Sequence, residues 1–188
     1  HYCLRSLVSR AIIRRVPLIN ITPAGYIYIG LYFSIAARSR NTVTGLVNSL
    51  QKMKEVVWLC ETGGEFQIGM AVCLRHVHEL DGFMNILSEK FPGLFFEKSV
   101  SFQFSASAYP RKYLSEMKFK HQPFTIIDKG QEVVLDHIDE TVLGGLSSFG
   151  HHSLRELAAE LEMPVSTLDL RLGKLRDKGI LQGFIYEL

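Results

Sequence analysis

Residues 26–107 carry a pattern of apolar and polar positions that changes between the period of a strand and the period of a helix. Four short runs are rich in β-branched and aromatic residues, which predicts strands at residues 26–35, 56–60, 67–74 and 95–107. Apolar residues recur every three or four positions between them, which predicts helices at residues 42–53 and 78–90. The order β-α-β-β-α-β is that of a ferredoxin-like fold, in which an antiparallel sheet of four strands carries two helices on one face.

The strands of this predicted sheet carry aromatic residues on both alternating sides, for example Tyr28 and Tyr32 against Phe33. Because both helices lie on one face, the other face is bare, and an apolar bare face usually packs against another protein surface. We therefore expect the sheet to form a homo-oligomer, at least a dimer, through this face.

From residue 136 onwards the apolar spacing is helical again. Amphipathic stretches predict helices that start at Asp136, Leu154 and Val165, and a capping box of Ser153 and Glu156 precedes the second. A glycine ends the third helix and a short strand follows, which is the plan of a winged helix-turn-helix. The fold class is therefore α+β, a ferredoxin-like βαββαβ domain followed by a winged helix-turn-helix.

The remaining segments set the expected domain limits. A short helix is predicted over residues 2–13, and residues 124–127 and 132–135 form a small hairpin around Asp128-Lys129-Gly130. The expected divisions are a tail at 1–15, the ferredoxin-like domain at 16–110, a linker at 111–135 and the winged helix-turn-helix at 136–188.

The composition is that of a globular protein, with 188 residues of which 47% are apolar and 21% are charged. Residues 1–135 carry 16 basic and 10 acidic groups, whereas residues 136–188 carry 5 and 9, which supports two modules. No apolar run is long enough to span a membrane, and we find no signal peptide and no paired cysteine motif. We expect a cytoplasmic protein with reduced cysteines and no membrane contact.

Several motifs together resemble the Lrp/AsnC family of prokaryotic transcription regulators. The opening of the family's helix-turn-helix is similar to Leu135-Asp136-x-x-Asp139-x-x-Val142-Leu143-x-x-Leu146. Its second and recognition helices are similar to Leu154-x-x-Leu157-Ala158-x-x-Leu161 and Ser166-Thr167-Leu168-x-x-Arg171-x-x-x-Leu175-x-x-x-Gly179-Ile180. The βαββαβ block resembles the family's RAM domain, and the resemblance implies that it forms oligomers and senses a small molecule.

The order of the modules is unusual, because members of that family place the helix-turn-helix before the RAM domain. A weak internal repeat accounts for this, since Tyr2-x-Leu4-x-x-Leu7…Ile12-Ile13 aligns with Leu170-x-Leu172-x-x-Leu175…Ile180-Leu181. We therefore expect a fragment of a tandem-repeat protein. It would hold the tail of a truncated first helix-turn-helix, one RAM-like domain and a second helix-turn-helix.

The third predicted helix is the candidate reader of DNA. Residues at the start of a recognition helix contact base edges and phosphates, and lysines further along reach phosphates. The candidate residues for binding double-stranded DNA are Ser166, Thr167, Arg171, Lys174 and Lys178. Arg171 lies at the edge of the apolar stripe, which leaves local pairing open as an alternative. Asp169 and the excess of acidic groups in residues 136–188 oppose DNA binding, which depends largely on phosphate neutralisation.

The candidate effector site is the turn between the second and third predicted strands. It is similar to the family's G-x-[Tyr/Phe]-Asp turn, except that Gln67 replaces the aspartate, and the resemblance implies that an amino acid binds there. The candidate residues are Gly63, Gly64, Glu65, Phe66 and Gln67. The alternative is an ordinary hairpin turn that uses its glycines for a positive φ.

Motifs for catalysis or metal binding are missing from the sequence. His76 and His78, and the adjacent His151 and His152, have no third ligand at metal spacing. We therefore expect no enzymatic activity, no cofactor and no metal. The preferred hypothesis is a DNA-binding transcription regulator that dimerises through its RAM-like sheet, and the alternative is a sensor or assembly module whose degenerate helix-turn-helix does not bind DNA.

Overall fold

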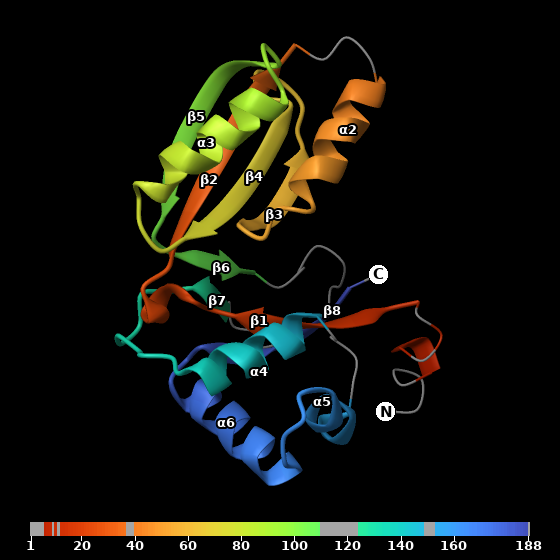
Figure 1. Cartoon of the computed structure of the whole chain (residues 1–188), viewed down its shortest axis with the longest axis vertical. Helices are drawn as coiled ribbons and strands as arrows, with labels where there is room; N and C mark the ends of the chain where they lie inside the picture. The colour runs from red at the N-terminus through yellow and green to blue at the C-terminus, as the bar shows by residue number, and fades with distance from the viewer. Residues whose placement is uncertain are drawn as a thin grey trace, which may run out of the picture. The chain divides into compact units, whose positions relative to one another are not determined.

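The computed structural model describes residues 6–8, 10, 12–36, 40–109, 124–148 and 153–187. The chain divides into two compact units (Figure 1). The sheet unit comprises residues 25–104, and the helical unit comprises residues 1–24 and 105–188.

The sheet unit contains the predicted ferredoxin-like arrangement. Its described elements are β2 (Ile27–Ile35), α2 (Arg40–Leu50), β3 (Val56–Glu61), β4 (Ile68–Leu74), α3 (Glu79–Lys90) and β5 (Phe95–Gln103). The strands form an antiparallel sheet in the order β3-β4-β2-β5, and both helices cover the same face (Figure 1). The predicted order of elements is confirmed, although the strand expected over residues 95–107 ends at Gln103.

Alternation along the strands places the core of the sheet unit on the helix-covered face. Ile29, Leu31 and Phe33 of β2 are all buried, while Tyr28 and Tyr32 point to the opposite face and are only half-buried. The rest of this core comes from β4, from the inner sides of the helices and from the residue before β5: Ile68, Met70, Val72, Leu74, Leu46, Leu50, Phe83, Leu87 and Leu94. Burial of these side chains fixes the register of the sheet, because a slip of one residue would turn them all to solvent.

The helical unit contains α4 (His137–Ser148), α5 (Leu154–Glu160) and α6 (Val165–Asp177). These helices lie where the apolar spacing predicted them. Ser153 and Glu156 form the predicted capping box, in which the Ser153 backbone N–H donates to Glu156 at 2.8 Å and the Glu156 N–H donates to the Ser153 hydroxyl at 3.3 Å. The core of the unit is lined by Val133, Val142, Leu143, Leu146, Leu157, Ala158, Leu168, Leu172, Leu175, Ile180 and Leu181.

An antiparallel strand pair completes the helical unit. The short strand after the third helix was predicted, whereas its partner strand and the pairing were not. β1 (Arg14–Ile19) pairs along its whole length with β8 (Leu181–Glu187). Pro17 is tolerated because each strand of such a pair is an edge strand. Residues 16–24 therefore belong to the helical unit. The expected division, which began the ferredoxin-like domain at residue 16, is wrong for this segment. Half of the helix predicted over residues 2–13 lies outside the described residues. Of the described half, residues 6–8 are helical and residues 10, 12 and 13 are not.

A second pair of short strands replaces the predicted hairpin. β7 (Phe124–Ile127) pairs with β6 (Ala106–Ala108), so residues 132–135 are not its partner. They follow another course because Val133 is buried in the helical core and its N–H donates to the Pro23 carbonyl at 2.7 Å. The linker expected at residues 111–135 thus contains core residues of the helical unit, and residues 110–123 lie outside the described part of the chain.

Candidate functional site

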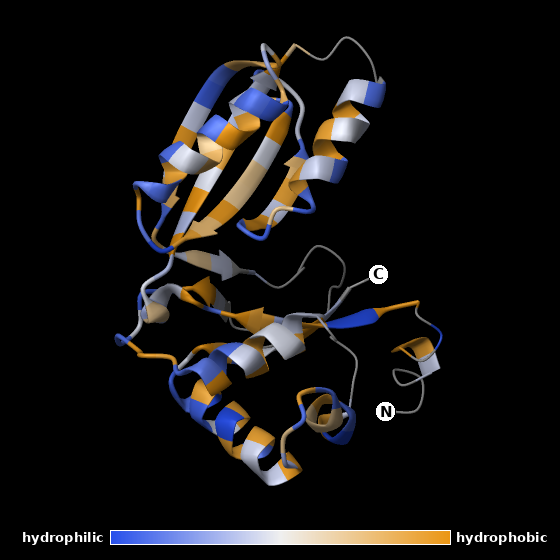
Figure 2. Cartoon of the chain, in the orientation of Figure 1, coloured by the Kyte–Doolittle hydropathy of each residue, from blue (hydrophilic) through white to orange (hydrophobic). Residues whose placement is uncertain are grey.

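Helix α6 has one apolar side and one solvent-exposed side, and the alternation between them is visible in Figure 2. Its leucines at positions 168, 172 and 175 are buried in the helical core. Of the candidate DNA-binding residues, Ser166, Lys174 and Lys178 are exposed and Thr167 is half-buried. Burial of the leucines therefore leaves the start of α6 and its lysines accessible to a ligand in solution.

Arg171 has a structural role within the helical unit. Its Nη1 forms ion pairs with Asp136 and with Asp139, at 2.9 Å for Asp139. The hydrogen bond from Arg171 and the one from the Asp139 backbone hold the pKa of Asp136 below its usual value, and the same pairing raises the pKa of Arg171. The structure therefore shows the local pairing that the sequence left open as the alternative for Arg171, and a contact between Arg171 and DNA stays a prediction.

The outward side of α6 is mixed in character. Asp169 is exposed, and Leu170 and Val165 have 59% and 41% of their surface accessible. A side chain added at Gly173 would meet nothing within 4 Å. This surface therefore combines a serine and lysines, which suit DNA, with an acidic group and apolar side chains, which do not.

The candidate effector residues all lie in the turn that joins β3 to β4. Gln67 holds this turn closed, because its amide nitrogen donates to the carbonyls of Gly64 at 2.7 Å and Glu65 at 3.2 Å. Its amide oxygen accepts from the Ile35 N–H at 3.0 Å. Gly64 has φ +100°, as the ordinary hairpin alternative requires. Gly63 and Glu65 are exposed, whereas Phe66 is half-buried with its ring centroid 6.3 Å from that of Tyr32.

The uncovered face of the sheet has a floor of small residues and several large rings. Gly30 is tightly packed there, since a Cβ on it would come 2.6 Å from the Ser101 hydroxyl. Trp58 of β3 pairs with Ala71 on this face and is 49% exposed, and the half-buried Tyr28 and Tyr32 of β2 lie on the same face. An exposed tryptophan and two tyrosines on one face are the composition of a surface that packs against another one.

No signal in the sequence indicated a cavity at the other end of the β3–β4 hairpin, beside Glu55 and Phe83. Its walls come from four separate parts of the chain, so no local motif could indicate it. The histidines at positions 76 and 78 stack with ring centroids 5.3 Å apart. Among the described residues, no three histidine, cysteine, aspartate or glutamate side chains come together as metal ligands. None of the described helices has the length and apolarity needed to cross a membrane.

Comparisons with known proteins place this fold. No protein-family model matches the chain. An uncharacterised HTH-type transcriptional regulator of Pyrococcus abyssi is 38% identical over 55 residues, which are 29% of this chain and 37% of that protein. This chain therefore spans little more than a third of the curated relative that it matches.

Two solved structures cover larger parts of the chain. The siroheme decarboxylase NirDL, solved with an iron-uroporphyrin III analogue, has a TM-score of 0.60 at 14% identity over 99% of this chain and 54% of its own. An AsnC family transcriptional regulator from Agrobacterium tumefaciens has a TM-score of 0.50 at 17% identity over 60% of this chain and 76% of its own. The resemblance found in the sequence is confirmed at the level of the fold: the chain has an Lrp/AsnC-like α+β fold.

Proposed function

We propose that this chain is part of a transcription regulator, in which α4, α5 and α6 form a helix-turn-helix that reads double-stranded DNA. The orientation of α6 carries the proposal. Its leucines are buried, its first turn presents Ser166, and Lys174 and Lys178 extend into solvent, which is the placement of a recognition helix. The similarity to an HTH-type regulator supports it. The proposal assigns no catalytic activity to the chain.

The DNA contact is tested by a titration with labelled genomic duplexes at several salt concentrations, followed by fluorescence anisotropy. We expect binding that weakens steeply with salt, and a slope of log affinity against log salt that falls by about 1 in Lys174→Ala. Lys129→Ala is the matched control, because Lys129 is an exposed lysine of the same unit away from the helices. Equal slopes for the two variants, or no binding at low salt, would contradict the proposal.

Dimerisation through the uncovered face of the sheet is the second part of the proposal. A regulator of this kind binds two half-sites, so it needs a symmetric pair of reading helices. We expect light scattering to show a dimer that Trp58→Glu dissociates, because a carboxylate would then be buried in an apolar interface. Val77→Glu is the control, since Val77 is equally exposed but lies after β4. A Trp58→Glu protein that remains a dimer would exclude this face.

The third part of the proposal is that an amino-acid effector binds at the turn 62–67. Since the amide of Gln67 is used within the turn, Glu65 is the group we assign to the ammonium of an amino acid. The measurement is calorimetry with a set of amino acids on the wild type and on Glu65→Gln. Loss of the binding heat in Glu65→Gln supports the assignment, and an unchanged heat rejects it.

The outward surface of α6 favours a second candidate function, an assembly or sensor module whose helix-turn-helix packs on a protein partner. Asp169 repels phosphates, and Leu170 and Val165 present an apolar surface. Asp169→Lys distinguishes the two functions. If the wild type does not bind DNA and this variant does, the unit is a scaffold that has lost DNA binding, whereas tight binding by the wild type rejects the second function.

A further inference from the structure

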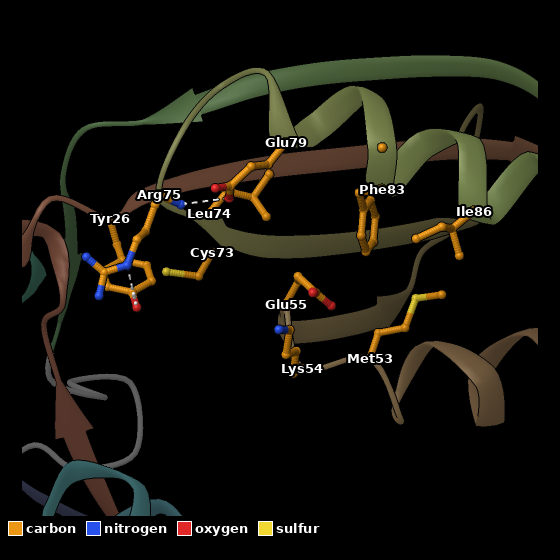
Figure 3. A pocket seen from close by; sticks show the side chains of 11 residues that line it. Tyr26, Met53, Lys54, Glu55, Cys73, Leu74, Arg75, Glu79, Phe83 and Ile86 are labelled. Carbon is orange, nitrogen blue, oxygen red and sulfur yellow. Dashed lines mark hydrogen bonds between the residues drawn. The ribbon is translucent and has the colours of Figure 1, made fainter. Parts of the chain in front are cut away.

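A cavity of about 860 Å³ lies at the end of the sheet where β3 begins and β4 ends (Figure 3). Its wall is formed by Tyr26 just before β2, by the segment after α2, by the residues at the end of β4, and by the first turns of α3. The volume is within the range of small-molecule sites. The turn 62–67 lies at the opposite end of the same hairpin, so the cavity is separate from the effector site proposed above.

The walls of the cavity are largely apolar. Phe83 and Ile86 project into it from α3, and Met53 faces them from the segment after α2 (Figure 3). Ile86 is 53% exposed, although it lies on the side of α3 that lines the cavity. Cys73 contributes a neutral thiol, because burial raises its pKa to about 12. Gly82 leaves the wall open, since a Cβ there would meet nothing within 4 Å.

Glu55 supplies a fixed negative charge to this apolar cavity. Its carbonyl accepts from the Cys73 N–H at 2.8 Å, which fixes its backbone beside β4. Its side chain is half-buried and extends into the cavity near Phe83 (Figure 3). Within the described parts of the chain, no group donates a hydrogen bond to this carboxylate. A carboxylate that is partly removed from water is stabilised by a cation, which makes Glu55 a recognition group.

The other charged groups around the cavity form hydrogen bonds within the chain or are exposed to solvent. The carboxylate of Glu79 accepts from the Arg75 backbone N–H at 3.1 Å. The guanidinium of Arg75 donates to the Tyr26 hydroxyl at 3.1 Å and lies 4.5 Å from the centre of that ring. Lys54 is exposed at the rim, where water and salt screen its charge. Glu55 and Glu79 are therefore the two carboxylates in the wall of the cavity. Of these, Glu79 already accepts a hydrogen bond from the chain, so Glu55 is the one we assign to a ligand.

We propose that this cavity binds a small organic cation with an apolar body, whose ammonium group pairs with the Glu55 carboxylate and whose body packs against Met53, Phe83 and Ile86. The geometry favours an ammonium over a carboxylate ligand, because a carboxylate would be placed against Glu55. The site does not depend on DNA binding by the helical unit, and its test uses no DNA.

The test measures binding of three probes with the same six-carbon chain to the full chain, by calorimetry and by amide chemical shifts. We expect n-hexylammonium to bind and to shift the amides of residues 53–55 and 73–86. Hexanol and hexanoate should bind at least about tenfold more weakly, since they lack the charge-assisted hydrogen bond to Glu55. Hexanoate binding as tightly as n-hexylammonium, or no shift in these segments with any probe, would overturn the proposal.

Two pairs of variants localise the site. Glu55→Gln removes the charge with little change of shape and should weaken n-hexylammonium binding about tenfold, whereas Glu61→Gln, on the same hairpin, should not. Gly82→Leu should fill the cavity and abolish binding, whereas Gly45→Leu should leave it unchanged. Gly45 and Gly82 are both helical and both have open space, and leucine favours a helix over glycine at either position, so a loss of folding is not expected. Equal binding by the two members of either pair would overturn the proposal.

Discussion

Arg171 of α6 pairs with Asp139 at the start of α4, and this contact links the two helices. Asp139 is almost entirely buried, with 5% of its surface exposed, and Asp136 completes the cluster by accepting from the Asp139 N–H at 2.8 Å. Such a pair adds little net stability by itself, but removal of one partner leaves a buried charge without compensation. The cluster therefore matters most for the position of α6.

Arg171→Ala should lower the melting temperature of the helical unit by several degrees, because Asp139 then remains buried without a cation. Arg155→Ala is the control, since Arg155 is an exposed arginine on α5. Circular dichroism during heating compares the two variants. If the melting temperatures of both variants fall by the same small amount, the cluster does not position α6.

Acid should weaken the same cluster. The pKa of Asp136 is held below its ordinary value of 3.8 in the folded chain, so its stabilising contribution is fully present above that pH. The contribution is lost as the pH falls through the lower pKa of the folded state. The wild type should therefore be more stable than Asp136→Asn at neutral pH, and the difference in melting temperature should shrink below pH 3.8. A difference that does not change between pH 7 and pH 3 would contradict the assigned cause.

Glu162 adopts a positive φ of 51° in the turn between α5 and α6. This conformation costs a non-glycine residue about 1–2 kcal/mol, which a glycine would not lose. Part of this gain is offset, because glycine loses more conformational entropy when the chain folds. Glu162→Gly should therefore stabilise the unit by about 0.5–1 kcal/mol in urea denaturation. Ala159→Gly, at an exposed position inside α5, should instead destabilise it by about 1 kcal/mol. Destabilisation by Glu162→Gly would show that its side chain has a role beyond the turn.

The parts of the fold that depend on local periodicity could be predicted from the sequence. The alternation in β2 and the leucine spacing in α6 each fix a buried side, and the capping box at Ser153 marks a helix start that the structure has. Each of these signals is contained in a window of a few residues. Local preference and tertiary packing agree there, so pattern reading succeeds.

The parts that depend on distant partners could not be predicted. β1 has a proline and two arginines, and it is a strand because β8, at the other end of the chain, pairs with it. For Arg171 the sequence left a DNA contact and local pairing open, and the choice depends on Asp139, 32 residues away. The cavity beside Glu55 needs four separate segments to come together. Spatial proximity of this kind leaves no periodic signal.

Gln67 links the 62–67 turn to the end of β2, and this link can be tested apart from any ligand. Gln67→Ala removes the acceptor of the Ile35 N–H and both donors to the turn carbonyls. We expect a loss of about 1–2 kcal/mol for the sheet unit, since the site is only partly buried. Hydrogen exchange of the Ile35 amide should become faster, because its partner is gone, whereas the Ala36 amide should be unaffected, because it donates to the Leu94 carbonyl at 2.7 Å. If both amides exchange at their original rates, Gln67 does not hold the turn closed in solution.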